Sequence, residues 1–553
     1  MSSDSKKFFG LTVAASIFVA AVVFIQLAVR VWFLQDHLFF HAEQVRDFFV
    51  VWNAWHNHTW ITLGPIQADT NGVHLGPGYY YLLLFFAAPL GFSPLAGPVM
   101  TTVLFLAAWV LVFWYLATRY NETLAVMFGL LLAVSENYFL YSSYALNMNV
   151  VFLFEALLII GLMEYVRVRS HGWLIAAGIG FTCLLHLHLS AYVLAPVVVF
   201  WFVYHYKILR ADKAVWKPLL VIVAFFLLSY APFIVAEFQH QFPEIRALFR
   251  FVFVQGELSN PVYNSAARLA DRGTAAYPVI WAQTVMVWIY ASAFSHEYDQ
   301  VMRAIPYAKQ SAGIIGSVVI IASLVGVVVR RAFVWQWMKV CEAKTYGAFS
   351  FIALFSVLLI SFAAKVHSTS VRHYIMIFFV PLLVLAIISV RLWNAQRVWQ
   401  RAIVVVGLVG FVLLNAWNAS IDFQVQAHFP INEPYEGFSS NYTEQRNIAQ
   451  KIADAMQSEI AEHPTWVYEI RASKNRKGLR DVMSYLLLLT DKKQLPIERR
   501  CEKRCTKEQA NRVIIIDYGH PLIPGKELLL TDGQYAVYLM DQGAVKKFEK
   551  QLQ

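Results

Sequence analysis

Long apolar runs recur along this chain, and they constrain its fold more than any other feature. A helix needs about 17–25 consecutive apolar residues to cross a bilayer. Runs of this kind lie at 8–34, 95–117, 124–142, 150–166, 172–190, 191–206, 218–236, 310–329, 346–364, 374–390 and 402–419. Of the 553 residues, 58% are hydrophobic and 14% are charged, which excludes an ordinary soluble globular class. The sequence predicts an α-helical polytopic membrane protein with about eleven transmembrane helices.

Basic residues are distributed unevenly among the loops between these runs. With the N-terminus inside, the cytoplasmic loops carry Arg119, Arg167, Arg169, Lys207, Arg210, Lys213, Lys217, Arg330, Arg331, Lys339, Lys344, Arg391, Arg397 and Arg401. The short outer loops near Ser143 and Ser190 carry no Lys or Arg. This asymmetry predicts a cytoplasmic N-terminus, and it explains most of the net charge of +10 without a nucleic-acid partner. The run 8–34 exceeds a signal-peptide core and is interpreted as a retained anchor.

Two further apolar runs, 77–91 and 278–295, would invert the charge pattern if they crossed the membrane. Their aromatic content favours helices that lie at the outer interface. The outer face then receives the loops 35–77 and 237–305 and the short loop 365–373. The predicted membrane domain is 1–420.

The composition changes abruptly after this domain, at 421–553. Residues 443–463 have helical apolar spacing, and Trp466–Ile470, Val513–Asp517 and Tyr535–Met540 have the pattern of short strands. The topology predicts a periplasmic α/β domain, large enough to bury its own core. Cys501 and Cys505 could form a disulfide there, or remain two unpaired thiols.

An acidic pair follows the first apolar run. Glu43 and Asp47 are four residues apart, so on a helix they would share one face, with Arg46 alongside. A partly desolvated carboxylate at a membrane surface can act as a general base. The alternative is a solvated acidic turn of an interfacial helix.

Two other segments of the predicted outer face could bind an anion. His74 begins the sequence HLGPGYYY, whose Gly and Pro allow a tight turn into a helix, and His74 could donate to a phosphate oxygen. Taken alone, this segment is better explained as a helix entry with an aromatic interfacial belt. Lys365, Arg372 and His373 lie on a basic outer loop, against the charge trend, and suit a phosphate or pyrophosphate.

The remaining polar clusters leave more than one interpretation. The loop 237–272, with His240 and Arg246, is either an amphipathic cover over a site or an interfacial helix pair. His186 and His188 end a span as site walls or buried hydrogen-bonding groups. No zinc spacing and no Walker loop occur. No metal is assigned, although Glu43, Asp47, Asp69 and the nearby histidines could bind a divalent cation.

Together these motifs resemble a known family. The order is one span, an outer acidic motif (EQVR from Glu43), a Gly/Pro-Tyr segment (HLGPGYY), many spans, and a basic RHY motif at Arg372 before a span containing Pro381. It is similar to the polyprenyl-phosphate-sugar-dependent transferases of the type C glycosyltransferase (GT-C) fold. That family includes protein O-mannosyltransferases and the lipid A aminoarabinose transferase. Residues 232–248 also resemble its bacterial members.

The resemblance implies an inverting glycosyltransferase of the bacterial inner membrane, acting on the periplasmic face. Its partners would be a polyprenyl-phosphate-linked sugar and a glycan, lipid or protein acceptor. The family base is usually Asp; here Glu43 matches that position, and Asp47 is the second candidate. The expected phosphate ligands are Lys365, Arg372, His373, His74 and Arg46, and the expected site walls are Tyr79, Tyr80, Tyr81, His188, His240 and Arg246. The alternatives are a glycan polymerase or ligase using a pyrophosphate donor, or a lipid or sugar transporter.

Overall fold

The computed structural model describes most of the N-terminal half of the chain and parts of the C-terminal half. The described residues are 7–8, 10–36, 40, 42–67, 73–249, 356, 376–377, 379–394, 397–428, 442–457, 462, 468–472, 485–487, 512–518, 528–532 and 535–541. Apart from residue 356, predictions for 278–295, 310–329, 346–364 and 365–373, and for Cys501 and Cys505, lie outside these residues.

The protein is mostly helical, and five of the described helices are long and apolar enough to cross a membrane. They contain the spans Val13–Trp32, Ala96–Arg119, Asn147–Val168, Trp216–Gln239 and Val398–Trp417. Shorter apolar helices include α5 (Glu122–Val134), α8 (His171–Leu187), α9 (Leu194–Tyr204) and α19 (Phe379–Asn394). The predicted helical membrane class is confirmed, because the described helices coincide with the apolar runs.

The chain forms two compact units. Residues 1–27, 60–82 and 100–419 make up the first, called here the helical unit. Residues 28–59, 83–99 and 420–553 make up the second, called here the mixed unit. The helices α1 (Val13–Asp36), α3 (Gly78–Ala87) and α4 (Ala96–Arg119) contribute residues to both. The proposed division into 1–420 and 421–553 stays a prediction.

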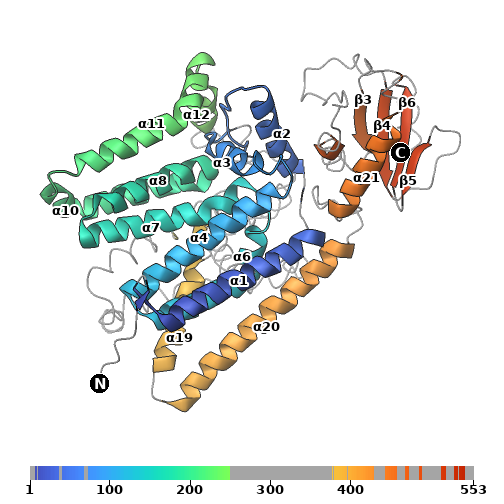
Figure 1. Ribbon diagram of the computed structural model, residues 1–553. Coiled ribbons are helices and arrows are strands. Elements are labelled where there is room, and N and C mark those ends of the chain that lie inside the picture. The colour runs from blue at the N-terminus through green and yellow to red at the C-terminus, as the bar shows by residue number, and fades with distance from the viewer. Residues whose placement is uncertain are drawn as a thin grey trace, which may run out of the picture. The chain divides into compact units, whose positions relative to one another are not determined.

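In the helical unit, α7 (Val151–Val168), α8 and α11 (Trp216–Gln239) lie side by side (Figure 1). Two glycines allow α7 and α8 to approach closely. A Cβ on Gly161 would lie 2.6 Å from the Trp173 carbonyl oxygen, and one on Gly180 would lie 2.5 Å from that of Phe154. Small residues at helix crossings provide this kind of contact in membranes, where burial from water drives little association.

Several predicted span boundaries were wrong. The run 124–142 is two helices, α5 and α6 (Glu136–Tyr141), because Ser135 has an extended backbone and ends one while beginning the other. The Asn415 side chain accepts the Glu136 backbone N–H at 2.9 Å and so satisfies the donor exposed by this break. A hairpin of β1 (Lys7–Phe8) and β2 (Leu11–Thr12) precedes α1, so the first helix begins later than predicted.

Other boundaries shifted for local reasons. Between α8 and α9 the chain forms an extended residue, His188, and a 3₁₀ turn at Leu189–Val193, where the sequence shows no polar turn. The predicted span 402–419 is part of α20 (Val398–His428), whose 31 residues continue past the apolar run. The length of an apolar run determines how much of a helix the bilayer can cover, but the helix itself can continue beyond the run.

The mixed unit contains a four-stranded sheet of order β3-β4-β6-β5. Strand β3 (Tyr468–Ala472) pairs in parallel with β4 (Arg512–Tyr518), while β6 (Tyr535–Asp541) is antiparallel to β4 and to β5 (Leu528–Asp532). Helix α21 (Tyr442–Ala455) contacts β5. The predicted helix and three strands are confirmed; β5 was not predicted.

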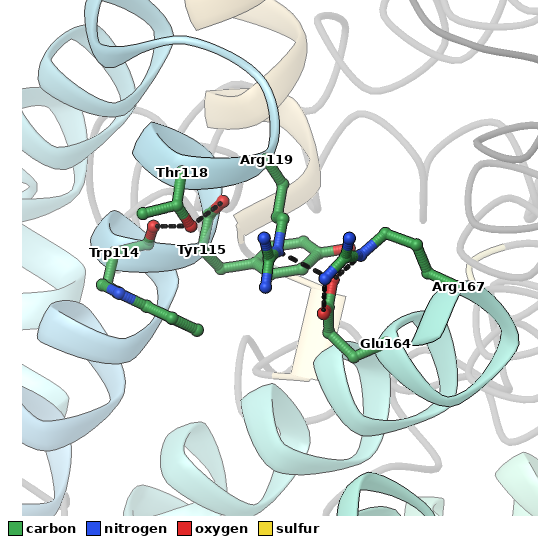
Figure 2. Close-up of polar contacts among 6 residues, drawn as sticks. All are labelled: Trp114, Tyr115, Thr118, Arg119, Glu164 and Arg167. Atoms are coloured by element: carbon green, nitrogen blue, oxygen red, sulfur yellow. Dashed lines mark hydrogen bonds and ion pairs between the residues drawn. The ribbon is translucent and has the colours of Figure 1, made fainter. Parts of the chain in front are cut away.

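A buried carboxylate ties two helix ends together in the helical unit. Figure 2 shows Arg119 of α4 and Arg167 of α7 converging on Glu164. Arg119 Nε lies 3.1 Å from Oε1, and Arg167 donates to both oxygens, at 2.8 and 2.6 Å. Glu164 is fully buried, so its charge is tolerated because these guanidinium groups neutralise it.

We expect Glu164→Gln to lower the unfolding free energy by about 2–3 kcal/mol, because two cations lose a charge-assisted partner. The value lies at the low end for buried pairs, since the two arginine side chains remain 29% and 39% exposed. Thermal unfolding of the purified protein in detergent measures the loss. Arg210→Gln, which removes an exposed charge from α10 (Tyr206–Ala211), is the control. Equal unfolding temperatures for Glu164→Gln and wild type would contradict the expectation.

Candidate functional site

The acidic pair lies on α2 (Ala42–His56), as the spacing predicts. Glu43 is in the first helical turn, where a carboxylate interacts favourably with the positive end of the helix dipole. The two side chains differ in environment: Asp47 is fully buried and Glu43 is half-buried. Glu43 is therefore the carboxylate of the pair with access to solvent.

Arg46 contacts its neighbour on α2. Its Nε and Nη2 each lie 2.9 Å from Asp47 Oδ1, and its side chain is 30% exposed while that of Asp47 is 1% exposed. This ion pair explains how a carboxylate is buried at this position. In the structure the Arg46 guanidinium is paired with Asp47, and its expected role as a phosphate ligand stays a prediction.

An aromatic cluster of the mixed unit holds α2 in place. Tyr485 is fully buried, and its ring centroid lies 5.1 Å from that of Phe49 and 5.7 Å from those of Phe40 and Phe48. Its hydroxyl donates to the Phe92 carbonyl oxygen at 2.7 Å. Aromatic pairs at these distances add to the free energy of burial. Tyr485, from the C-terminal part of the chain, thus packs against the helix that carries Glu43, and no sequence motif indicated this contact.

In the helical unit, His74 lies on a short antiparallel pair of segments. The Gly64 N–H donates to the Leu75 carbonyl at 2.8 Å, the Leu75 N–H to the Pro65 carbonyl at 3.2 Å, and the Gln67 N–H to the Val73 carbonyl at 2.9 Å. A Cβ on Gly64 would collide with the Gly76 carbonyl, so only glycine permits this pairing. The segments 64–67 and 73–75 are called here the His74 hairpin.

The residues that follow, Gly76-Pro77-Gly78, form a turn against α8 and α11. The Gly78 N–H donates to His186 Nδ1 at 3.3 Å, which places the ring proton on Nε2, facing Ser229 Oγ at 3.2 Å. The His186 ring stacks on Tyr230, with centroids 3.9 Å apart. His186 is buried, so of the two earlier interpretations it is a buried hydrogen-bonding group.

Glu244 of α12 (Pro243–Phe249) binds His74 with both carboxylate oxygens. Oε2 accepts the His74 backbone N–H at 2.7 Å, and Oε1 lies 3.0 Å from Nδ1. Glu237 of α11, also buried, accepts the N–H groups of Glu244 and Ile245 at 3.0 Å each. These two contacts cap the N-terminus of α12. Sequence reasoning missed both residues. The partner of Glu244 is 170 positions away, and the partners of Glu237 lie at the start of the next helix.

The expected wall residues have different environments. Tyr79 and Tyr80 are buried, and Tyr81 donates to the Ile61 carbonyl at 3.0 Å. Their expected role as site walls stays a prediction. His188 is buried and contacts Ser190 within its own turn. His240 and Arg246 are exposed, and Arg246 Nε donates to the Phe242 carbonyl.

Lys365, Arg372, His373 and Asp69 lie outside the described residues. Within the described part of the chain, no group of three or more His, Cys, Asp or Glu side chains could hold a metal ion.

The His74–Glu244 contact should weaken in acid. Partial burial alone would raise the pKa of Glu244, but the hydrogen bonds and charge of His74 lower it below its ordinary value of about 4.5. A lowered folded-state pKa means that the contact stabilises above the unfolded-state value and is lost as pH falls through the folded one. We expect the difference in unfolding temperature between wild type and Glu244→Gln to be largest above about pH 4.5, the ordinary glutamate value, and to shrink as the pH falls below it. A difference that stays constant down to pH 3 would contradict this.

No protein-family model matches the chain, and no curated protein matches it. Solved structures do resemble it. ArnT from Cupriavidus metallidurans bound to undecaprenyl phosphate is 12% identical, with a TM-score of 0.53 over 95% of this chain and 98% of that chain. Its apo state has a TM-score of 0.52 at the same identity and coverage. The Archaeoglobus fulgidus oligosaccharyltransferase complex with Zn and sulfate is 10% identical, with a TM-score of 0.48 over 86% and 61% of the two chains.

The two ArnT structures carry the conclusion about fold. Their likeness extends over nearly the whole of both chains, so the chain has an ArnT-like GT-C membrane fold. This confirms the fold that the motifs from Glu43 to Arg372 implied.

Proposed function

We propose that this protein is an inverting glycosyltransferase that moves a sugar from a polyprenyl phosphate to an acceptor hydroxyl. The observation that carries the proposal is the near-complete overlap with a GT-C protein whose structure holds undecaprenyl phosphate. The acidic pair, the His74 hairpin and the basic segment at Lys365 occur in the order that this family of transferases has along its chain. Fold alone does not fix an activity, so the side chains must supply the chemistry.

In the proposed reaction, Glu43 takes the proton of the acceptor hydroxyl. The acceptor oxygen then forms a bond to the anomeric carbon while the bond from that carbon to the phosphate oxygen breaks on the opposite side. The products are the inverted glycoside and the polyprenyl phosphate, which leaves with the bonding electrons. Lys365, Arg372, His373 and His74 are the proposed ligands of that phosphate, which gains negative charge as the bond breaks.

The half-buried position of Glu43 supports its role as base, because a base must reach the hydroxyl proton. Asp47 remains the second candidate, although its burial and its ion pair with Arg46 favour a supporting role. The charge asymmetry of the loops supports a site on the periplasmic face of a bacterial inner membrane.

Mass spectrometry of lipid extracts tests the proposal. Cells that lack the protein are expected to accumulate one glycosyl-phosphoryl-polyprenol, and cells that express it are expected to turn that lipid over. The accumulated lipid identifies the sugar, and its single phosphate distinguishes a phosphate donor from a pyrophosphate donor. Unchanged polyprenol lipids, or accumulation of a pyrophosphate-linked glycan, would overturn the proposal. A transporter would leave the donor's chemistry intact in both strains.

A further inference from the structure

Both carboxylate oxygens of Glu244 contact one residue, His74. One oxygen accepts the His74 backbone N–H at 2.7 Å and the other contacts Nδ1 of the same residue at 3.0 Å. The first contact fixes the chain and the second fixes the rotation of the ring. Because Glu244 uses Nδ1, a ligand would bind His74 through Nε2, and the His74 side chain is 28% exposed.

Glu237 fixes Glu244 in turn. It is 2% exposed and accepts two consecutive N–H groups at the start of α12, those of Glu244 and Ile245. A buried carboxylate with two charge-assisted hydrogen bonds is held firmly, because breaking them would leave a charge buried without a partner, which costs much free energy. The result is a series of contacts from α11 through α12 to the His74 hairpin.

We propose that Glu244 is a positioning residue that orients His74 and balances its charge for binding the phosphate of the lipid-linked donor. Glu237 holds Glu244 in position for this role. The inference rests on the proposed function, and it adds two residues of the loop 237–272 to it. A protonated imidazole donates from Nε2 to a phosphate oxygen while Nδ1–H donates to the carboxylate, so both partners of the ring are anionic acceptors.

Few other charged groups belong to the described parts of the elements around His74, and one of them, Glu237, is bonded to the backbone of α12. Arg246 on α12 and His240 at the end of α11 are both exposed, and Arg246 contacts a carbonyl of its own segment. His186 on α8 accepts the Gly78 N–H. Among the described residues, Glu244 is therefore the carboxylate that an imidazolium at His74 would pair with.

A binding titration with undecaprenyl phosphate tests the role. The probe is added to the purified full-length protein in detergent micelles at pH 6 and at pH 8. Part of any pH effect comes from the phosphate itself, which titrates near pH 6. H74Q, which keeps a hydrogen-bond donor but cannot titrate, measures that part.

E244Q is expected to bind about 10-fold more weakly than wild type at both pH values. The reason is that the amide gives an imidazolium no anionic acceptor at Nδ1, so the ring loses a charge-assisted hydrogen bond. E244D keeps the charge but is one methylene shorter. It is expected to bind more weakly than wild type at both pH values and to keep the wild-type ratio between them. The two variants separate the effect of the carboxylate charge from the effect of side-chain length. E244D also tests the role if E244Q fails to fold.

The chain provides a matched control in a second histidine–carboxylate pair. His171 Nε2 lies 2.9 Å from Asp212 Oδ2, with side chains 35% and 15% exposed. His171 begins α8 and His186 lies near its other end, about 22 Å away at 1.5 Å per residue. D212N is expected to bind the probe as wild type does. If it weakens binding as E244Q does, the effect is a general loss of stability and the inference is overturned.

The outcomes separate this inference from the proposed function. If wild type binds undecaprenyl phosphate and H74Q weakens it while E244Q matches wild type at both pH values, the positioning role of Glu244 is overturned and the proposed function stands. If wild type does not bind the probe at all, the proposed function fails and this inference fails with it. Equal binding by wild type and H74Q also overturns the inference.

Discussion

Glu43→Gln is expected to lower sugar transfer by about 10²–10⁴-fold while donor binding and folding stay near wild type. The amide keeps the size of the side chain but cannot take the proton from the hydroxyl of the acceptor substrate. Glu43 is half-buried in the first turn of α2, so its side chain supports little of the packing. Single-turnover assays with a glycosyl-phosphoryl-polyprenol measure the chemical step, and the unfolding temperature measures the fold.

Asp47→Asn is the companion variant, and it should behave differently. Asp47 is buried against Arg46, so its replacement is expected to destabilise the protein by about 1–3 kcal/mol through the loss of this charge-assisted contact. If Glu43→Gln keeps near-wild-type turnover and Asp47→Asn folds but loses it, Asp47 is the base. If both folded variants keep their activity, neither carboxylate is the base.

Gly76→Ala is expected to reduce both stability and transfer. An added Cβ would collide with the His186 ring and would lie 2.7 Å from Tyr230 Cε1, well inside normal carbon contact distances of about 3.5–4.0 Å. His186 cannot retreat easily, because it stacks on Tyr230 and faces Ser229. Overpacking of this kind costs about 1–3 kcal/mol, and a displacement of about 1 Å in a positioning segment can cost about 100-fold in rate.

Gly172→Ala is the matched control, because its Cβ would meet only Ser170 Oγ at 3.8 Å. Alanine also suits a helix better than glycine, so this variant should be as stable as wild type or more stable. Thermal unfolding and transfer assays on both variants make the comparison. Wild-type values for Gly76→Ala would show that the turn adapts and that its packing against His186 is unimportant.

The sequence by itself determined the class of protein and the helix that carries the acidic pair. A bilayer requires apolar runs of a minimum length, so the membrane helices are readable from composition. The four-residue spacing of Glu43 and Asp47 predicts that both lie on one face if the segment is helical, because successive turns are neighbours. The sequence could not show that Asp47 is buried and Glu43 half-buried, since burial depends on which elements cover α2.

Tertiary structure alone decided the partners of these residues. His74 and Glu244 are 170 positions apart, and Tyr485 reaches the carbonyl of Phe92 across 393. Nothing in either local sequence encodes such a pairing, because it arises only when helices and loops pack. The break at Ser135 also involves a distant partner: an apolar run favours one long helix, but here the Glu136 N–H donates to Asn415, 279 residues away. Local pattern sets which segments are helices, and packing sets which polar groups meet.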